Sequence, residues 1–155
     1  MFSNLKSKKV VITGNTGFKG AWLSLFLKKI GANVVGYSDK IEYKNSIFTK
    51  RNINSFVKQY WHDIRDTNKI HEVFLREKPD IIFHLAAQPI VLEGYKNPFE
   101  TLNININGTI NILDITKKLF PEIPLIIITS DKVYKNQDKN VALTEDSERF
   151  GDCPY

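Results

Sequence analysis

Three glycines that could hold a phosphate stand near the start of the chain: Gly14, Gly17 and Gly20 follow the apolar run 10–12 and precede a helix-like stretch. A strand that turns sharply into a helix offers backbone N–H groups and the positive end of the helix dipole to an anion. Glycine also lets a pyrophosphate come close to the backbone. The spacing departs from the GxGxxG fingerprint, and an ordinary glycine-rich strand-to-helix turn is the alternative. The pattern predicts a phosphate-binding turn.

A second group of reactive side chains follows the apolar run 125–129, where Ser130, Asp131 and Lys132 place a hydroxyl, a carboxylate and an amine in succession. Such a density of functional groups is unusual for a plain loop. The alternative is a β-turn at the end of a strand, with Asp131 as the turn former.

Two further strand ends carry residues of interest. A carboxylate at Asp63 could accept a hydrogen bond from an adenine amino group, although Asp63 or Asp66 could instead cap the next helix, and for Asp66 we prefer the cap. The small residues Ala86 and Ala87 could let the backbone pass close beneath a cofactor, or could serve packing alone. His84 lies inside an apolar run, so we expect a buried, hydrogen-bonded histidine rather than a catalytic base.

The elements that must position these residues alternate along the chain. Strand-like runs are residues 10–12, 33–37, 81–84 and 125–129, with a short strand at 59–61. Helices are predicted over residues 21–30, from Asp66 to the residue before Pro79, and over 98–119, whereas residues 40–60 remain unassigned. This alternation predicts an α/β domain with a Rossmann-like, doubly wound parallel sheet. Ligands of such sheets bind beyond the carboxyl ends of the strands, where all the residues above fall.

The composition of the chain limits which kinds of protein it can be. The 155 residues are 42% hydrophobic and 25% charged, which is the size and make-up of one globular domain, residues 1–155. No apolar run could span a bilayer, so we expect a cytoplasmic protein without a membrane partner. The net charge of +5 is read as a solvated surface rather than a nucleic-acid patch. Cys153 is the only cysteine, which excludes an internal disulfide and a cysteine zinc site, and we expect no metal.

With these residues in view, the chain resembles the extended short-chain dehydrogenase/reductase family and, within it, the CDP-glucose 4,6-dehydratases. The resemblance covers nearly the whole chain. It is carried by TGNTGFKGAWLSL at 13–25, by HLAAQPIV at 84–91, by residues 105–109 and by TSDKVY at 129–134.

The resemblance implies NAD as the cofactor and gives roles to the matching positions. The pyrophosphate would be held by Gly14, Asn15, Thr16, Gly17, Phe18 and Gly20. The adenine would contact Asp63 and Ile64, and the ribose and nicotinamide would contact Leu85, Ala86, Ala87 and Gln88. Asn105 would be a helix residue that orders the backbone and water of the active site.

For the chemistry, the resemblance implies a conversion of CDP-glucose to CDP-4-keto-6-deoxyglucose. C4 is oxidised, water leaves across C5 and C6, and hydride returns to C6. Ser130 would hydrogen-bond the sugar's 4-hydroxyl, Asp131 would be the general acid, and Tyr155 would remove the 4-hydroxyl proton. Lys132 stands where related dTDP-glucose dehydratases place a glutamate base. The family also implies a homo-oligomer.

The chain departs from the family pattern at three places. Ser38 stands where many NAD-binding relatives carry an aspartate that grips the ribose, so NAD rather than NADP rests on the resemblance. Residues 92–94 lack the usual basic and serine residues. The chain stops at Tyr155, so we expect an N-terminal portion of a family member. In this portion the sheet would be incomplete on its C-terminal side and the sugar-binding lobe would be absent. We expect no dehydratase turnover from residues 1–155 by themselves.

Two alternatives stay open from the residues. One is another nucleotide-sugar epimerase or dehydratase of the same superfamily. The other is a non-catalytic dinucleotide-binding module.

Overall fold

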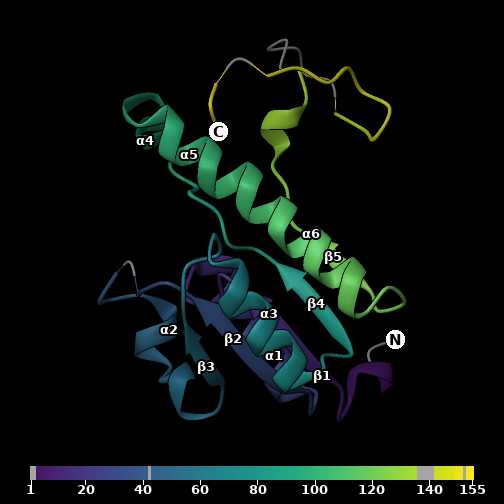
Figure 1. Ribbon diagram of the computed structural model, residues 1–155. Helices are drawn as coiled ribbons and strands as arrows, with labels where there is room; N and C mark the ends of the chain where they lie inside the picture. The colour runs from purple at the N-terminus through teal and green to yellow at the C-terminus, as the bar shows by residue number, and fades with distance from the viewer. Residues whose placement is uncertain (1–2, 42, 136–141, 152) are drawn as a thin grey trace.

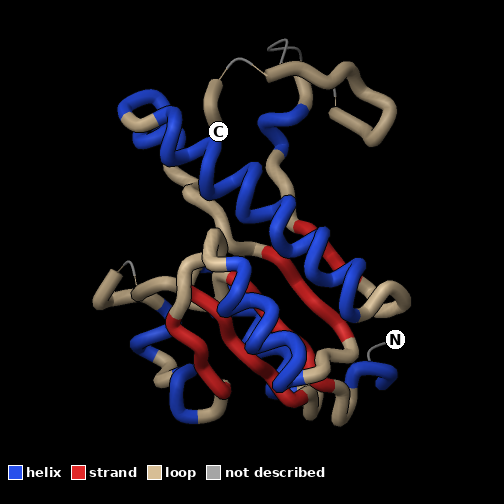
Figure 2. Tube along the Cα trace, in the orientation of Figure 1, coloured by secondary structure: helices blue, strands red, loops and turns tan. Residues whose placement is uncertain are grey.

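The computed structural model describes residues 3–41, 43–135, 142–151 and 153–155. Its centre is a parallel five-stranded sheet in the order β3-β2-β1-β4-β5. The strands are β1 Lys9–Thr13, β2 Asn33–Ser38, β3 Lys58–Trp61, β4 Ile81–His84 and β5 Leu125–Ile127. Figure 2 shows the strands running side by side with helices on both sides of the sheet. The predicted Rossmann-like fold is confirmed.

The strands β1 and β2 form because their apolar runs are buried on both faces, whereas the edge strands β3 and β5 have no buried residue. Val10, Val11 and Ile12 of β1 are fully buried. The register pairs Thr13 of β1 with Tyr37 of β2 and with His84 of β4. The carboxyl ends of the three central strands are therefore level, and the loops that follow them meet at one edge of the sheet.

The helices make two layers (Figure 1). Their bounds are α1 Phe18–Lys29, α2 Ile47–Lys50, α3 Thr67–Glu77, α4 Val91–Lys96, α5 Pro98–Leu102 and α6 Gly108–Leu119. Short turns complete the order, namely η1 Ser3–Leu5, η2 Ile53–Ser55, the π-helical segment η3 Asn103–Asn107, and η4 Asp131–Val133. Because side chains alternate across β1, Val10 and Ile12 pack beneath α1 and α2, whereas Val11 packs beneath α3 and α6.

Most predicted elements are present, with shifted ends. The side chain of Asp66 accepts a hydrogen bond from the amide of Lys69 at 3.0 Å, so the predicted cap of α3 is confirmed. Gly31 follows α1 with φ of +85°, a backbone conformation that glycine adopts without strain. α1 starts at Phe18 rather than at residue 21, because the glycine turn itself forms the first helical turn. β5 ends at Ile127 rather than at residue 129, although the amide of Ile128 still bonds to the carbonyl of His84.

The predicted helix over 98–119 is confirmed as α5, η3 and α6 in continuous helical conformation. Its middle is a π-helical turn, which the sequence did not indicate. The hydroxyl of Thr109 donates to the carbonyl of Asn105 at 2.6 Å, and a side chain that takes a helix carbonyl in this way disturbs the regular ladder.

Two regions differ from the sequence-based expectation. Residues 91–96 form the helix α4, although the sequence indicated only a loop there. The unassigned region contains α2 and η2, joined through Asn52 in the left-handed conformation. Within the described residues, no helix has both the length and the apolar character needed to cross a bilayer. The end of the chain, yellow in Figure 1, lies beside α4 and α5.

Candidate functional site

The glycine turn is shaped by close backbone approaches. Gly14 has φ of +71°, and a Cβ there would lie 2.6 Å from the amide nitrogen of Ala86, so the turn touches the loop after β4. A Cβ at Gly20 would lie 2.3 Å from the carbonyl oxygen of Gly14. Gly17 is the N-cap of α1 and no side chain caps that helix. The first amides of α1 therefore lack an intrahelical acceptor, as the start of any helix does, and no side chain takes its place.

The side chains of Asn15 and Thr16 lie inside this turn. Asn15 is fully buried, donates through Nδ2 to Oε1 of Gln59 at 2.7 Å, and accepts at Oδ1 from the hydroxyl of Ser38 at 2.8 Å. Thr16 donates through its hydroxyl to the carbonyl of Lys40 at 2.8 Å. These bonds tie the turn to β2 and β3, so Asn15 and Thr16 have their backbone amides, rather than these side-chain donors, to offer a ligand.

The sequence did not indicate that Gln59 and Ser38 would hold the side chain of Asn15. Ser38 was noted as the replacement for an acidic residue, whereas here it is 5% exposed and orients Asn15. Ser38 is the last residue of β2, whereas Gln59 is the second residue of β3, so no strand-end signal marked Gln59.

His84 is buried and hydrogen-bonded, as predicted. Its Nδ1 lies 2.7 Å from the hydroxyl of Thr13 and its Nε2 lies 3.0 Å from the hydroxyl of Thr109. Because Thr109 donates its proton to the carbonyl of Asn105, it accepts from His84, which assigns the proton to Nε2. Burial lowers the pKa of His84 to about 4, so the ring is neutral near pH 7.

The hydroxyl of Thr13 connects His84 to the loop after β4 by hydrogen bonds. With its own proton given to Nδ1 of His84, the Thr13 hydroxyl accepts from the amides of Leu85 and Ala86, each at 3.2 Å. The predicted nicotinamide-side residues Leu85 and Ala86 are thus fixed from beneath by a histidine and two threonines. Thr13 and Thr109 were missed, because nothing in their spacing marks them as partners.

Gln88, in the same loop, is held by Asn105 in the π-helical segment. The amide of Gln88 donates to Oδ1 of Asn105 at 2.8 Å, and Nδ2 of Asn105 donates to the carbonyl of Gln88 at 3.2 Å. Nε2 of Gln88 also donates to the hydroxyl of Thr101 at 2.8 Å. Ala87, between these fixed residues, is exposed. Asn105 therefore orders the loop backbone, whatever it contacts in addition.

Asp63 lies at the carboxyl end of β3, where an adenine contact was predicted. Its carboxylate is gripped by Arg65, with Nε at 2.9 Å from Oδ1 and Nη2 at 2.7 Å from Oδ2. These hydrogen bonds hold the pKa of Asp63 below its usual range. Arg65 also bonds to Glu100 of α5 at 2.9 Å. The Asp63 side chain remains 39% exposed, so its carboxylate stays accessible to a further donor.

Ile64 is a core residue. It is 6% exposed, and a Cβ at Gly108 would lie 2.7 Å from its Cγ2, so the absence of a side chain at Gly108 lets α6 pack on it. Nδ2 of Asn111 donates to the carbonyl of Ile64 at 3.3 Å. A cofactor would meet the backbone of Ile64 rather than its side chain.

The predicted catalytic residues lie in two places. Ser130 caps the short turn η4 by accepting from the amide of Lys132 at 3.1 Å, and its hydroxyl lies 3.3 Å from Oδ1 of Asp131. Asp131 and Lys132 are exposed. Tyr155 lies against α4, since a Cβ at Gly94 would be 3.7 Å from its amide nitrogen. Among the hydrogen bonds of the described residues, none joins Tyr155 to Ser130, Asp131 or Lys132.

The described residues contain no group of three or more histidine, cysteine, aspartate or glutamate side chains placed to hold a metal ion.

Strand order, glycine turn and uncapped helix start together define a Rossmann-type α/β domain. Residues 11–155 match the family model described as GDP-mannose 4,6 dehydratase, and the chain belongs to that family.

Relatives at the sequence level include CDP-glucose 4,6-dehydratase of Salmonella typhimurium, which is 38% identical over 97% of this chain and 42% of the relative. The dTDP-D-glucose 4,6-dehydratase of Dictyostelium discoideum is 30% identical over 90% of this chain and 34% of the relative. The chain thus spans less than half the length of these relatives.

Among solved structures, UDP-glucose 4-epimerase from Stenotrophomonas maltophila superposes with a TM-score of 0.82 and 25% identity. The match covers 96% of this chain and 44% of that one, and that structure holds NAD and formylated UDP-arabinopyranose. The likeness confirms the fold.

Proposed function

We propose that this protein is the NAD-binding portion of a nucleotide-sugar 4,6-dehydratase that acts on CDP-glucose. The observation that carries the proposal is the 38% identity with CDP-glucose 4,6-dehydratase over 97% of this chain. That relative has the activity in its name, and the motifs TGFKGAWL and TSDK stand at strand ends, as the resemblance requires. A cytoplasmic location remains part of this proposal.

The residues present fit a dinucleotide. The uncapped start of α1 offers amides to a pyrophosphate, and the missing Cβ atoms of Gly14 and Gly20 let the turn close against the loop after β4. Asp63 offers a partly exposed carboxylate at one end of the site, and the fixed backbone from Leu85 to Gln88 forms its other end. NAD in the relative from Stenotrophomonas maltophila supports the same ligand here.

Bound NAD would supply a reversible hydride acceptor, and the net reaction is the loss of one water from the sugar without net oxidation. In this chain Ser130 would orient the sugar's 4-hydroxyl and Tyr155 would take its proton. Asp131 would protonate the departing 6-hydroxyl, and Lys132 would take the C5 proton or stabilise the enolate formed when that proton leaves. The exposure of Asp131 and Lys132 supports their access to a substrate.

The test measures both NAD binding and turnover. Residues 1–155 are titrated with NAD by calorimetry, and they are also fused to the C-terminal part of the Salmonella typhimurium relative. We expect residues 1–155 alone to bind NAD without turnover. The fusion should release water from CDP-glucose, detected by mass spectrometry, in preference to dTDP-glucose and GDP-mannose. A preference for another nucleotide sugar, or no NAD binding, would contradict the proposal.

We also propose that the protein forms a homodimer through the helix made by α5, η3 and α6. Its exposed face carries an apolar stripe with spacings of three and four residues: Phe99, Leu102, Ile106, Ile110 and Leu113. A second copy placed across a twofold axis would bury this stripe against itself. Light scattering should report a dimer for the wild type and a monomer for Ile110→Lys, while Leu75→Lys on the exposed side of α3 should leave the dimer intact.

A further inference from the structure

The loop after β3 is tied to the start of the helix α5 by one arginine. Nε and Nη2 of Arg65 donate to the Asp63 carboxylate, and Nη1 lies 2.9 Å from each carboxylate oxygen of Glu100. Asp63 is only two residues from Arg65, whereas Glu100 is 35 residues away in the sequence. Glu100 is therefore the long-range contact that places the guanidinium.

The two carboxylates bind different parts of the guanidinium. Asp63 accepts from Nε at 2.9 Å and from Nη2 at 2.7 Å, and Glu100 accepts from Nη1. Because the donors of a planar guanidinium stand in fixed directions, holding Nη1 at Glu100 also sets where Nε and Nη2 point. The Arg65 side chain is 31% exposed, so it has room to rotate when the contact with Glu100 is removed.

These bonds decide which atom of Asp63 is left for a ligand. Oδ1 accepts from the backbone amide of Arg65 at 2.7 Å and from Nε at 2.9 Å. Within the part of the chain that the structure describes, Oδ2 accepts a single hydrogen bond, from Nη2. Since each carboxylate oxygen has about two acceptor sites, Oδ2 keeps one. The hydrogen bonds from Arg65 hold the pKa of Asp63 below its usual range, so near pH 7 this carboxylate accepts and does not donate.

We propose that Arg65 and Glu100 are positioning residues that make the site select a 6-aminopurine, by aiming the remaining acceptor of Asp63 at the amino group. The inference rests on the proposed function, in which the purine is the adenine of NAD. A fixed carboxylate accepts from the 6-amino group of adenine. Hypoxanthine has a carbonyl oxygen at that position, which the same carboxylate repels.

An ion pair that only stabilises the fold is the alternative. The Glu100 side chain is 49% exposed, and ion pairs as exposed as this contribute little to stability. Loss of a purely structural pair would weaken all dinucleotides equally or none of them. The two explanations therefore differ in the ratio of two affinities rather than in one affinity.

The test compares NAD with nicotinamide hypoxanthine dinucleotide, in which the adenine of NAD is replaced by hypoxanthine, by titration calorimetry with residues 1–155. We expect the wild type to prefer NAD by at least roughly tenfold. Arg65→Lys should remove most of this preference, because one amine cannot reproduce the fork of donors that joins both carboxylates. Glu100→Ala should lower it by roughly threefold, and Glu100→Gln, which keeps one acceptor for Nη1, should restore most of it. Affinity for the hypoxanthine dinucleotide should not fall in any of these variants.

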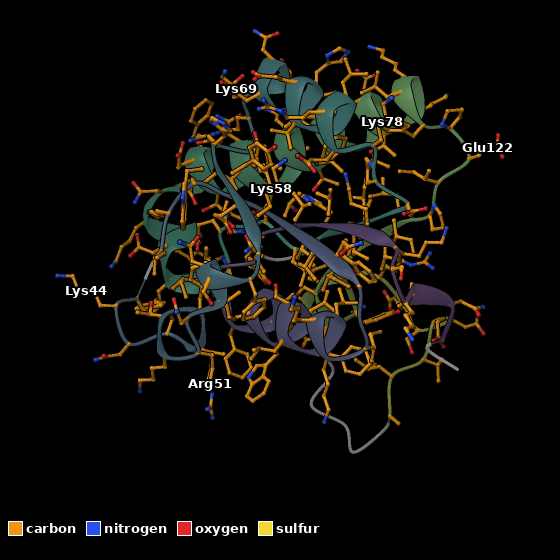
Figure 3. All side chains as sticks on the ribbon, turned by 90° about the horizontal axis from the view of Figure 1, so that it is seen from below. Lys44, Arg51, Lys58, Lys69, Lys78 and Glu122 are labelled. Atoms are coloured by element: carbon orange, nitrogen blue, oxygen red, sulfur yellow. The ribbon has the colours of Figure 1, made fainter. Side chains whose placement is uncertain are left out.

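Glu72→Ala is the matched control. It removes an exposed carboxylate that pairs with Lys69 at 2.8 Å on α3 and should keep the wild-type preference. Figure 3 shows Lys69 at the outer edge of the molecule. A second measurement needs no ligand: the pKa of Asp63, followed by NMR, should rise towards its usual range in Arg65→Lys, because the paired hydrogen bonds are lost.

The outcomes separate this inference from the proposed function. An unchanged preference for NAD in both Arg65→Lys and Glu100→Ala, or an equal loss of affinity for both dinucleotides, would overturn the inference and leave the proposed function standing. A wild type that binds both dinucleotides equally would also overturn it. A wild type that binds neither would contradict the proposed function, and the inference with it.

Discussion

Asn105 and Gln88 hold each other by two hydrogen bonds, with the Gln88 amide 2.8 Å from Oδ1 of Asn105 and Nδ2 of Asn105 3.2 Å from the Gln88 carbonyl. One residue lies in the π-helical turn and the other in the loop after β4. The helix therefore fixes the backbone of a loop predicted to face the nicotinamide.

Replacing Asn105 by aspartate removes one of these bonds. The carboxylate keeps an acceptor for the Gln88 amide but cannot donate to the Gln88 carbonyl, and two oxygens then face each other. We expect a loss of about 1–3 kcal/mol in the free energy of loop ordering and a roughly tenfold weaker affinity for NAD, measured by calorimetry. Asn107→Asp, exposed in the same turn, is the matched control. Unchanged NAD affinity in Asn105→Asp would show that the loop is ordered by other contacts.

Gly20→Ala tests the closure of the glycine turn. The new Cβ would lie 2.3 Å from the carbonyl oxygen of Gly14 and 2.7 Å from Cα of Asn15, so backbone must move. We expect the free energy of unfolding to fall by about 1–3 kcal/mol, measured by thermal unfolding, and NAD binding to be lost. Gly151→Ala meets no atom within 4 Å and should change neither quantity. A Gly20→Ala protein with normal stability would contradict the packing described here.

The buried ring of His84 should make the free energy of unfolding depend on pH. Its folded pKa of about 4 lies below the unfolded value of 6.5, so the unfolded chain binds the extra proton between these values. The neutral ring contributes its full stabilisation above pH 6.5, and this is lost as the pH falls toward 4. The loss amounts to roughly 3 kcal/mol at 1.36 kcal/mol for each pKa unit.

The measurement is the urea midpoint at pH 7.5 and at pH 4.5. His84→Gln should be less stable than the wild type at pH 7.5 and should lose much of the pH dependence. His71→Gln, exposed on α3, should keep it. An equal pH dependence of the urea midpoint in the wild type and in His84→Gln would contradict the assignment of a buried neutral histidine.

Lys132 distinguishes the proposed reaction from that of dehydratases with a glutamate in its place. Lys132→Glu reverses the charge beside Asp131, and we expect at least a roughly hundredfold loss of CDP-glucose turnover in the fusion protein. NAD affinity should be unchanged. Lys117→Glu, exposed on α6, controls for a change in net charge. Normal turnover with Lys132→Glu would remove Lys132 from the chemistry.

Much of the fold could be predicted from local sequence, because each signal lies within a few residues. The apolar run at Val10–Ile12 indicates a buried strand, and Asp66 caps a helix through an amide three residues away. The predicted helix over 98–119 is also present. The helix α4 escaped prediction because its six residues are too few to show a helical period.

The sequence by itself determined the order of the strands and helices, the glycine turn and the family, since these depend on neighbouring residues and on motif spacing. Only the tertiary structure decided which side chains hold the site. Thr13 and His84 are 71 residues apart, and Asn15 and Gln59 are 44 apart. Thr13 and His84 are partners in the register of β1 and β4, and Asn15 reaches over Gly36 of β2 to Gln59 of β3. The parallel register and the burial of the strands therefore fix which side chains face one another.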